Sequence, residues 1–221
     1  MVLDPAQLRS ETRVRLADLG YPDPPMHLPA LFDKEVGYSL RPIDDIVART
    51  AALNVVVTVS LGMPLDLAGE WISENGLRTA LSHSEVAAID GQEAGNVAEI
   101  QAQVEAIWAF VWVLSLGDQL DPATLCPDDL VRRVPDLRTG ESIEEWSERT
   151  GPRQRSADEV MRELDLYYGM TWGLADANLR RLPTPGGIDQ YAIWQRRRAL
   201  EFAIAERDWT HDEWDIIDLS T

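Results

Sequence analysis

The sequence predicts an all-α protein with a single helical domain of about eight helices. Apolar residues recur at three- and four-residue spacing in most long segments, which is the period of a helix with one buried face. Four segments start with Ser or Thr followed three residues later by Glu, the capping box of a helix N-terminus. Alternating strand patterns joined by short hairpin turns are missing from the sequence.

The domain is organised around residues 104–116, VEAIWAFVWVLSL, in which every residue from 107 to 114 is apolar. A helix with no polar face has to be buried. The segment is too short to cross a bilayer, which needs about 20 residues. We therefore expect a buried central helix at 97–116, ended by Gly117 and covered by amphipathic helices.

The first 29 residues are expected to form an N-terminal arm. Residues 4–19 have an amphipathic helical pattern, and Gly20 follows them, as glycine often does at the end of a helix. Residues 21–29, YPDPPMHLP, contain four prolines and are expected to be a linker. We therefore divide the chain into an N-terminal helix with a proline-rich linker at 1–29 and a helical domain at 30–221.

The remaining elements follow in order along the chain. Residues 31–40 fit a short extended segment, and Pro42 suits the first position of the next helix. Further helices are expected at 42–61, 65–74 and 82–89, after Ser142, at 156–181 and at 188–206. The fourth capping box, at 210–213, is expected to open a final turn that contains Trp214.

The charge of the chain limits its partners. It has 38 acidic and 20 basic residues in 221, a net charge of −18. This argues against nucleic-acid binding, in which Lys and Arg supply much of the affinity, and against an anionic membrane surface. A basic protein partner fits, because opposite charge raises association rates. The simpler alternative is that the charge only keeps the protein soluble.

Several features are those expected of a cytoplasmic protein. Cys126 is the only cysteine, so no disulfide forms within the chain, and a reducing compartment fits. The first residues lack the basic region and apolar stretch of a signal peptide. No window has 18 consecutive apolar residues, so no transmembrane helix is expected.

Glu105 is the first candidate for a functional residue, because it lies at the start of the apolar helix. A buried carboxylate is unfavourable unless it is paired or protonated. We expect Arg197 or Arg198 to pair with it in a structural ion pair. The functional alternative is a pocket acid with a raised pKa.

Other polar residues also lie close to apolar stripes. We expect Asp165 to hydrogen-bond with Tyr168 on the long helix, and Asp215 to bind a basic residue near Trp214. Local structure is the simpler interpretation of both pairs. The candidate pocket or buried polar residues are Glu105, Asp165, Tyr168, Arg197, Trp214 and Asp215.

No metal, cofactor or catalytic set is expected. His27, His83 and His211 are far apart, and one cysteine cannot complete a zinc site. The acidic residues of 212–218 lack the spacing and glycine of an EF-hand loop. Glycine-rich phosphate loops and nucleophile elbows are absent. The arginines of 196–198 point in different directions from one helix, and a phosphate site there is the functional alternative.

Three stretches carry a resemblance to a known family. They are 105–117, EAIWAFVWVLSLG; 163–175, ELDLYYGMTWGLA; and 197–221, with its Arg-x-Ala-Leu and Trp-Asp. In this order, from about residue 41 to the C-terminus, they resemble the bacterial family called domain of unknown function 4272. The resemblance implies a helical domain and brings no known activity.

The chain departs from that family's pattern at four positions. Gly169 and Thr171 stand where the family usually has Arg and His. Glu201 and Phe202 stand where it favours Asn and Trp. The first two departures remove chemically capable side chains, which disfavours an enzyme.

The sequence therefore favours a non-enzymatic interaction protein, acidic and intracellular, that acts as an adaptor or neutraliser of a basic partner. The alternative is a small-ligand-binding protein or an enzyme with a pocket between the central and C-terminal helices. Glu105, Asp165, Tyr168 and Arg197 would line that pocket. A closed core with Glu105 bound to an arginine favours the first hypothesis, and an open cavity that holds these four residues favours the second.

Overall fold

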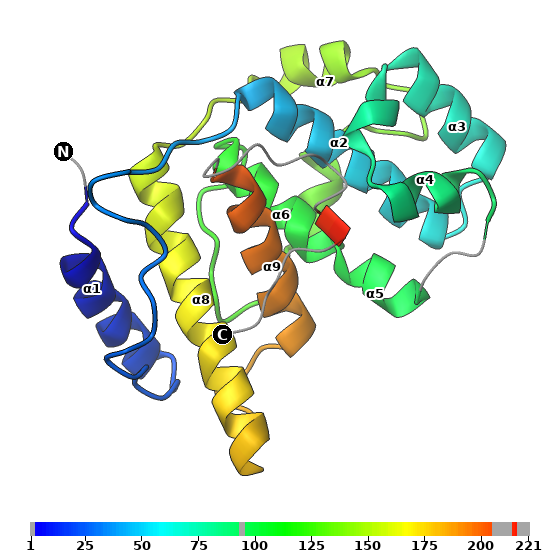
Figure 1. The fold of residues 1–221 in the computed structure, drawn as a ribbon. Helices are drawn as coiled ribbons and strands as arrows, with labels where there is room; N and C mark the ends of the chain where they lie inside the picture. Colours follow the sequence, from blue (N-terminus) through cyan, green and yellow to red (C-terminus); the bar gives the residue numbers. More distant parts are fainter. Residues whose placement is uncertain (1–2, 93–95, 205–213, 216–221) are drawn as a thin grey trace.

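Helices form nearly all the regular structure in the computed structural model, which describes residues 3–92, 96–204 and 214–215 (Figure 1). The α-helices are α1 (Pro5–Asp18), α2 (Ile43–Ser60), α3 (Leu65–Glu74), α4 (His83–Ile89), α5 (Val97–Ala102), α6 (Val104–Val113), α7 (Ile143–Thr150), α8 (Ala157–Arg180) and α9 (Gln190–Ala203). Short 3₁₀ helices lie at Leu77–Ala80 and Asp128–Arg132. The predicted class is confirmed: the fold is a single all-α domain.

Residues 31–40 differ from the expected extended segment. They form turns and irregular backbone, and within this segment Leu40 alone pairs, in an isolated antiparallel bridge with Ile204. The capping boxes at Ser82, Ser142 and Ser156 are confirmed, because each serine accepts from the backbone of the glutamate three residues later. The box expected at 210–213 lies outside the described residues.

The single central helix expected at 97–116 is two helices, and this prediction is wrong in that respect. α5 ends at Ala102 and α6 begins at Val104. The two helices differ in burial, since α5 has no buried residue whereas α6 is buried from Glu105 to Val113. The break falls where the sequence changes from polar to wholly apolar, so the two parts take different environments.

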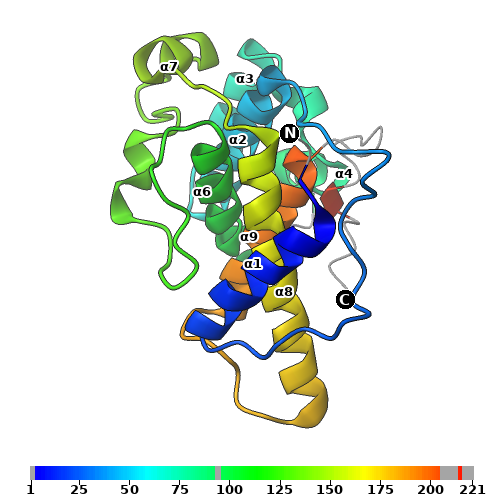
Figure 2. The same ribbon diagram turned by 90° about the vertical axis from the view of Figure 1, so that its left-hand side faces the viewer.

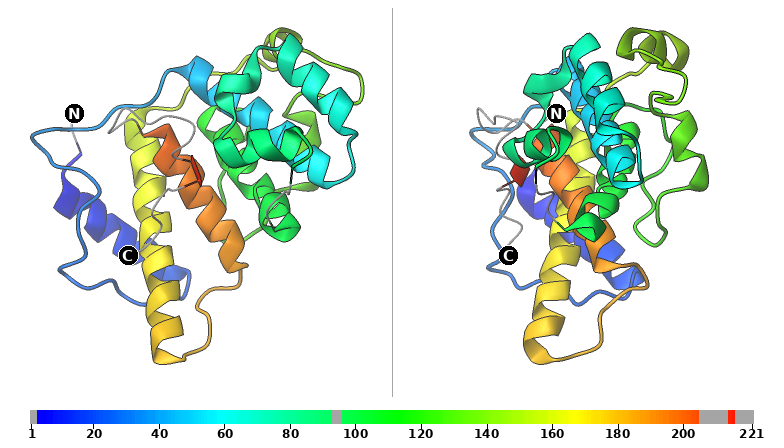
Figure 3. Two further views of the ribbon diagram at one scale, coloured as in Figure 1. Left: turned by 45° about the vertical axis from the view of Figure 1, so that its right-hand side comes forward. Right: turned by 90° about the vertical axis from the view of Figure 1, so that its right-hand side faces the viewer.

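α6 lies at the centre of the domain, in contact with α2 and α9, and α9 also packs against α8. The fully buried Phe110 and Leu200 show how α6 and α9 share one core. A second cluster around Trp71 joins α2, α3 and α4. Figure 3 shows this second group at the end of the molecule opposite α1. α6, which is apolar except for Glu105, is therefore covered by neighbours, as its composition requires.

α1 packs across α8, as Figure 2 shows from the α1 side. Leu8 and Leu16 are buried and belong to the main core cluster. A Cβ atom added at Gly169 of α8 would lie 2.6 Å from Leu16 Cδ1. Any larger residue at Gly169 would push Leu16 away, so this glycine permits the close approach of the two helices.

Ion pairs also join α1 to α8. Arg9 Nη2 lies 2.8 Å from Asp165 Oδ1, and Arg15 Nη1 lies 2.9 Å from Glu163 Oε1. The N-terminal helix is thus held by core contacts and by charge. The division of the chain after residue 29 stays a prediction, which deletion of 1–29 would test.

Candidate functional site

Glu105 binds an arginine in the closed core between α6 and α9. The carboxylate is buried, and its Oε2 accepts from Arg196 Nε at 2.9 Å and from Arg196 Nη2 at 2.7 Å. The expected partners, Arg197 and Arg198, are wrong. Successive residues of a helix point about 100° apart, and Arg196 is the one of the three that faces α6.

The remaining donors of Arg196 are also satisfied. Nη1 donates to the carbonyl oxygen of Asp121 at 2.6 Å and to Tyr167 Oη at 3.0 Å. Nη2 donates to the carbonyl oxygen of Thr124 at 2.7 Å. The backbone N–H of Cys126 donates to Glu105 Oε1 at 2.9 Å. We call Glu105, Arg196 and these partners the Arg196 centre; it fastens the loop after α6 to α8 and α9.

The thiol of Cys126 lies beside this centre and is chemically quiet. Burial raises the pKa of Cys126 to about 12, and the neighbouring Glu105 charge acts in the same direction. A thiol with this pKa is protonated at neutral pH, whereas the thiolate is the nucleophilic form. Cys126 is therefore suited to packing rather than to nucleophilic chemistry.

Asp165 and Tyr168 of α8 and Arg197 of α9 do not line the pocket described below. Asp165 accepts from Arg9 Nε at 3.2 Å and from Arg9 Nη2 at 2.8 Å. These two donors take the place of the predicted hydrogen bond with Tyr168. The Arg197 guanidinium lies 4.8 Å from the centroid of the Tyr168 ring. The structure therefore brings Tyr168 and Arg197 together, while Glu105 is bound in the separate Arg196 centre.

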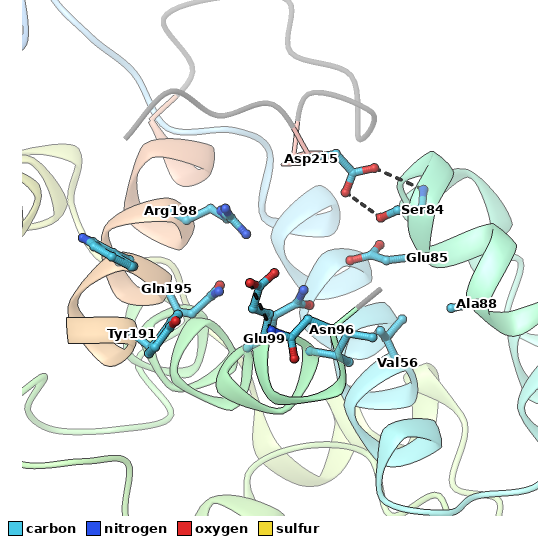
Figure 4. Close-up of a pocket in the computed structure, with 13 residues that line it drawn as sticks. Val56, Ser84, Glu85, Ala88, Asn96, Glu99, Tyr191, Gln195, Arg198 and Asp215 are labelled. Atoms are coloured by element: carbon cyan, nitrogen blue, oxygen red, sulfur yellow. Dashed lines mark hydrogen bonds between the residues drawn. The ribbon is translucent and has the colours of Figure 1, made fainter. Parts of the chain in front are cut away.

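A pocket of about 480 Å³ lies between α5 and α9, with further walls from α2, α4 and Asp215 (Figure 4). The pocket lies between helices of the predicted kind, but it is not lined by the residues predicted for a site there, Glu105, Asp165, Tyr168 and Arg197. The closed core with Glu105 bound to an arginine is the outcome that favours the interaction hypothesis. Of the residues expected to be functional, Asp215 lines it. The polar residues that matter most are Glu85, Glu99, Gln103, Gln195, Arg198 and Asp215. We call it the α9 pocket.

Two glutamine side chains in the α9 pocket are unsatisfied. Gln195 is only 6% exposed, and its Oε1 has no hydrogen-bond partner among the described residues. Gln103, at the break between α5 and α6, likewise has a buried Oε1 with no partner in that part of the chain. A buried acceptor left without a donor destabilises a fold by about 1–3 kcal/mol, so each oxygen marks a place for a ligand or water donor.

Arg198 points into the same pocket from α9 (Figure 4). Its Nε is buried without a partner, and the guanidinium forms no ion pair within residues 3–92, 96–204 and 214–215. Burial lowers the pKa of Arg198, although the nearby Asp215 charge acts in the opposite direction. The residue is partly buried, and its guanidinium lies 5.6 Å from the centroid of the Trp214 ring. A buried N–H donor without an acceptor is unfavourable in the folded protein.

Two of the three carboxylates around the pocket, Glu85 and Asp215, already have several hydrogen-bond donors as partners. Glu85 accepts from Arg49 Nη1 at 2.6 Å and Nη2 at 2.7 Å in a buried ion pair. Asp215 accepts from Ser84 Oγ at 2.8 Å and from Ser82 Oγ at 2.9 Å, as well as from the Ser84 backbone N–H at 3.1 Å. Among the described residues, the hydrogen-bond donors to Asp215 are thus two serines, while the charge of Arg198, which lies near Trp214, acts on Asp215 from nearby. The start of α4 supplies free N–H and hydroxyl donors.

Trp214 holds Asp215 in place. The indole is 1% exposed, and its ring centroid lies 5.9 Å from those of Phe110 and Phe202. The Arg49 guanidinium lies over the ring at 4.2 Å. The core contacts of Trp214 thus fix the neighbouring Asp215 against α4, where it completes the wall of the pocket.

Sequence reasoning missed Gln103 and Gln195, and it considered Arg198 only as a partner of Glu105 or as part of a phosphate site. One signal was present, because Gln195 occupies the same helical stripe as the buried Ala192 and Ala199. A polar residue at such a position indicates either a buried hydrogen bond or a cavity. The sequence offers no comparable signal for Gln103, which lies at a break that the helical pattern does not predict.

Two absences apply to the described part of the chain. None of its helices has the length and apolar composition needed to cross a membrane. Within the same residues, no group of three or more His, Cys, Asp or Glu side chains is placed to hold a metal ion.

Comparison with known proteins gives one match. Residues 8–217 match the family model described as domain of unknown function (DUF4272). No curated protein and no solved structure matches the chain. Because the family model spans most of the chain, the protein belongs to the DUF4272 family.

Proposed function

We propose that this protein is a non-enzymatic binding protein that holds a small ligand in the α9 pocket. The observation that carries the proposal is the pair Gln195 and Arg198, which line the pocket and whose buried Oε1 and Nε atoms have no hydrogen-bond partner among the described residues. The folded protein gains nothing by leaving these groups unpaired. A ligand that pairs with them restores their lost hydrogen bonds, and a volume of about 480 Å³ is within the range of small-molecule sites.

Two of the three acidic groups of the pocket are unsuited to act as a general base, which supports binding rather than catalysis. A general base needs an accessible lone pair that faces the proton it removes. The Glu85 carboxylate is held by Arg49, and Asp215 is held by Ser82 and Ser84. These two carboxylates therefore have a structural role, in which they hold the walls of the pocket in place.

The test is a ligand screen with a matched pair of proteins. Thermal-shift measurements with a library of small metabolites, followed by calorimetry on the hits, would compare the wild type with Arg198→Met. We expect at least one compound to stabilise the wild type and not the variant. Arg138→Met, at an arginine whose side chain is 86% exposed, is the control and should respond like the wild type. Hits that stabilise Arg198→Met equally, or no hits at all, would contradict the proposal.

A second candidate function is the capture of a basic protein, and the net charge of −18 favours it. It would act in the cytoplasm, where the lone Cys126 stays reduced. A pull-down from bacterial lysate, washed at low and then high salt, tests this function. One stoichiometric basic partner released by salt would support it, and no partner at either salt would contradict it.

A further inference from the structure

The groups left unsatisfied in the α9 pocket require two different kinds of ligand group. Arg198 is a cation and requires an anionic partner. Gln103 Oε1 and Gln195 Oε1 are acceptors and require N–H or O–H donors. Figure 4 shows the side chains of Gln195, Arg198 and Glu99 turned toward one another, so both kinds of group face one space. A single small ligand can therefore meet both requirements only if it carries an anion and a donor group.

The anionic group is best supplied by a carboxylate. The planar guanidinium of Arg198 presents paired N–H donors that match a carboxylate or a phosphate. The carboxylates of Glu85, Glu99 and Asp215 surround the same space. They repel a ligand with several negative charges more strongly than a ligand with one. The surroundings of Arg198 thus disfavour phosphates.

The donor group is best supplied by an ammonium. An ammonium has three donors, which matches the free oxygens of Gln103 and Gln195 together with the carboxylate of Glu99. Glu99 accepts only from Asn96 Nδ2, at 3.3 Å, among the described residues, so lone pairs remain for a ligand. The excess of negative charge around the pocket also favours a cationic group at this position.

Part of the pocket wall is apolar. Val56 of α2, Ile100 of α5 and Trp194 of α9 line it. A cavity of about 480 Å³ has room for an apolar side chain beside the two charged groups.

We propose that the α9 pocket binds a small zwitterion, an α-amino acid with an apolar side chain. Its carboxylate pairs with Arg198, and its ammonium binds Gln103, Gln195 and Glu99. This inference rests on the proposed function, since it names the ligand class of the same site.

The experiment is calorimetry with matched compounds. L-leucine and L-phenylalanine are the zwitterions; 3-phenylpropionate lacks the ammonium, and phenethylamine lacks the carboxylate. Inorganic phosphate and the dipeptide Phe-Phe complete the set. We expect an amino acid to bind the wild type about 10-fold or more tightly than either single-charge analogue, because each lost charged hydrogen bond weakens binding.

Variants assign each charge to its subsite. In Arg198→Met, L-phenylalanine should bind no better than phenethylamine, because the carboxylate has lost its partner. In Gln195→Met, it should lose most of its advantage over 3-phenylpropionate. Arg138→Met should keep the full preference for the zwitterion. Circular dichroism on each variant confirms that the fold is retained.

Each other outcome overturns a defined part of the argument. Equal binding of 3-phenylpropionate, or tighter binding of phosphate, would exclude the ammonium subsite. Tightest binding of phenethylamine would exclude the carboxylate subsite, and tighter binding of the dipeptide would exclude a free amino acid. If no amino acid binds but a metabolite from the screen depends on Arg198, the ligand class is wrong and the proposed function stands. If no compound depends on Arg198 in either experiment, both fail.

Discussion

Arg196 and Arg198 lie two residues apart on α9, yet their surroundings are opposite. The Arg196 side chain donates to Glu105, Tyr167 and two backbone carbonyls in a closed core. The Arg198 side chain lines a pocket and has no ion-pair partner in the described residues. Two residues of a helix turn the side chain by about 200°, so one reaches α6 and the other faces α5 and α4. The comparison shows that the groups around a charged side chain decide whether it stabilises the core or remains open to a ligand.

The largest expected effect on stability comes from removing Arg196 from the closed core. Arg196→Met leaves the Glu105 carboxylate buried without its cation, which should lower the free energy of unfolding by about 3–5 kcal/mol. Urea denaturation followed by circular dichroism measures it. The double variant with Glu105→Met should recover part of the loss, because no buried charge remains. A loss below about 1 kcal/mol in the single variant would show that the pair is solvated.

Removing Arg198 from the pocket is expected to change the free energy of unfolding in the opposite direction. Arg198→Met removes a partly buried cation whose Nε has no acceptor and which forms no ion pair among the described residues, so the free energy of unfolding should rise by about 0.5–2 kcal/mol. The same urea experiment measures it, with no ligand present. Arg138→Met should stay within about 0.5 kcal/mol of the wild type, as surface changes usually do. Destabilisation by Arg198→Met would mean that its guanidinium has a structural partner.

A smaller gain is expected from Gln195→Met. The change replaces an amide whose oxygen is unsatisfied with an apolar side chain of similar size, so stability should rise by up to about 1 kcal/mol. Differential scanning calorimetry on the ligand-free protein checks the sign. A lowered melting temperature would indicate that Gln195 is hydrogen-bonded in solution, by an ordered water for example.

The last prediction concerns reactivity and sharpens the description of the Arg196 centre. Burial raises the pKa of Cys126 to about 12, so the folded protein should react with a thiol reagent at pH 8 far more slowly than the unfolded chain. The reaction should speed up as the pH rises, because the thiolate fraction grows about tenfold per pH unit below the pKa. Arg196→Met should also speed it by loosening the loop. Fast labelling of the native wild type would contradict the closed centre.

The sequence predicts the helices better than it predicts the residues of the candidate site. The capping boxes and apolar periodicity predicted most helices, because both signals depend on residues within one or two turns. The break at Gln103 was missed, since the helical pattern runs through it without a proline or glycine. The sequence predicts the wrong arginine as the partner of Glu105. The spacing of apolar residues identifies a buried helix face but not which neighbouring side chain covers it. The sequence shows Gly169 only as a departure from the family pattern. The closeness of Leu16 explains why a glycine stands at this position.

The sequence by itself determined that this chain is helical, that residues 107–114 are buried, and that a carboxylate at Glu105 needs a cationic partner. Those conclusions follow from composition and local spacing, which act over a few residues. The tertiary structure alone decided that Arg196 supplies that partner, that Asp215 binds the start of α4, and that Gln195 and Arg198 face one pocket. The reason is physical: a helix fixes the angles between its own side chains, but its rotation against its neighbours is set by packing across the whole domain.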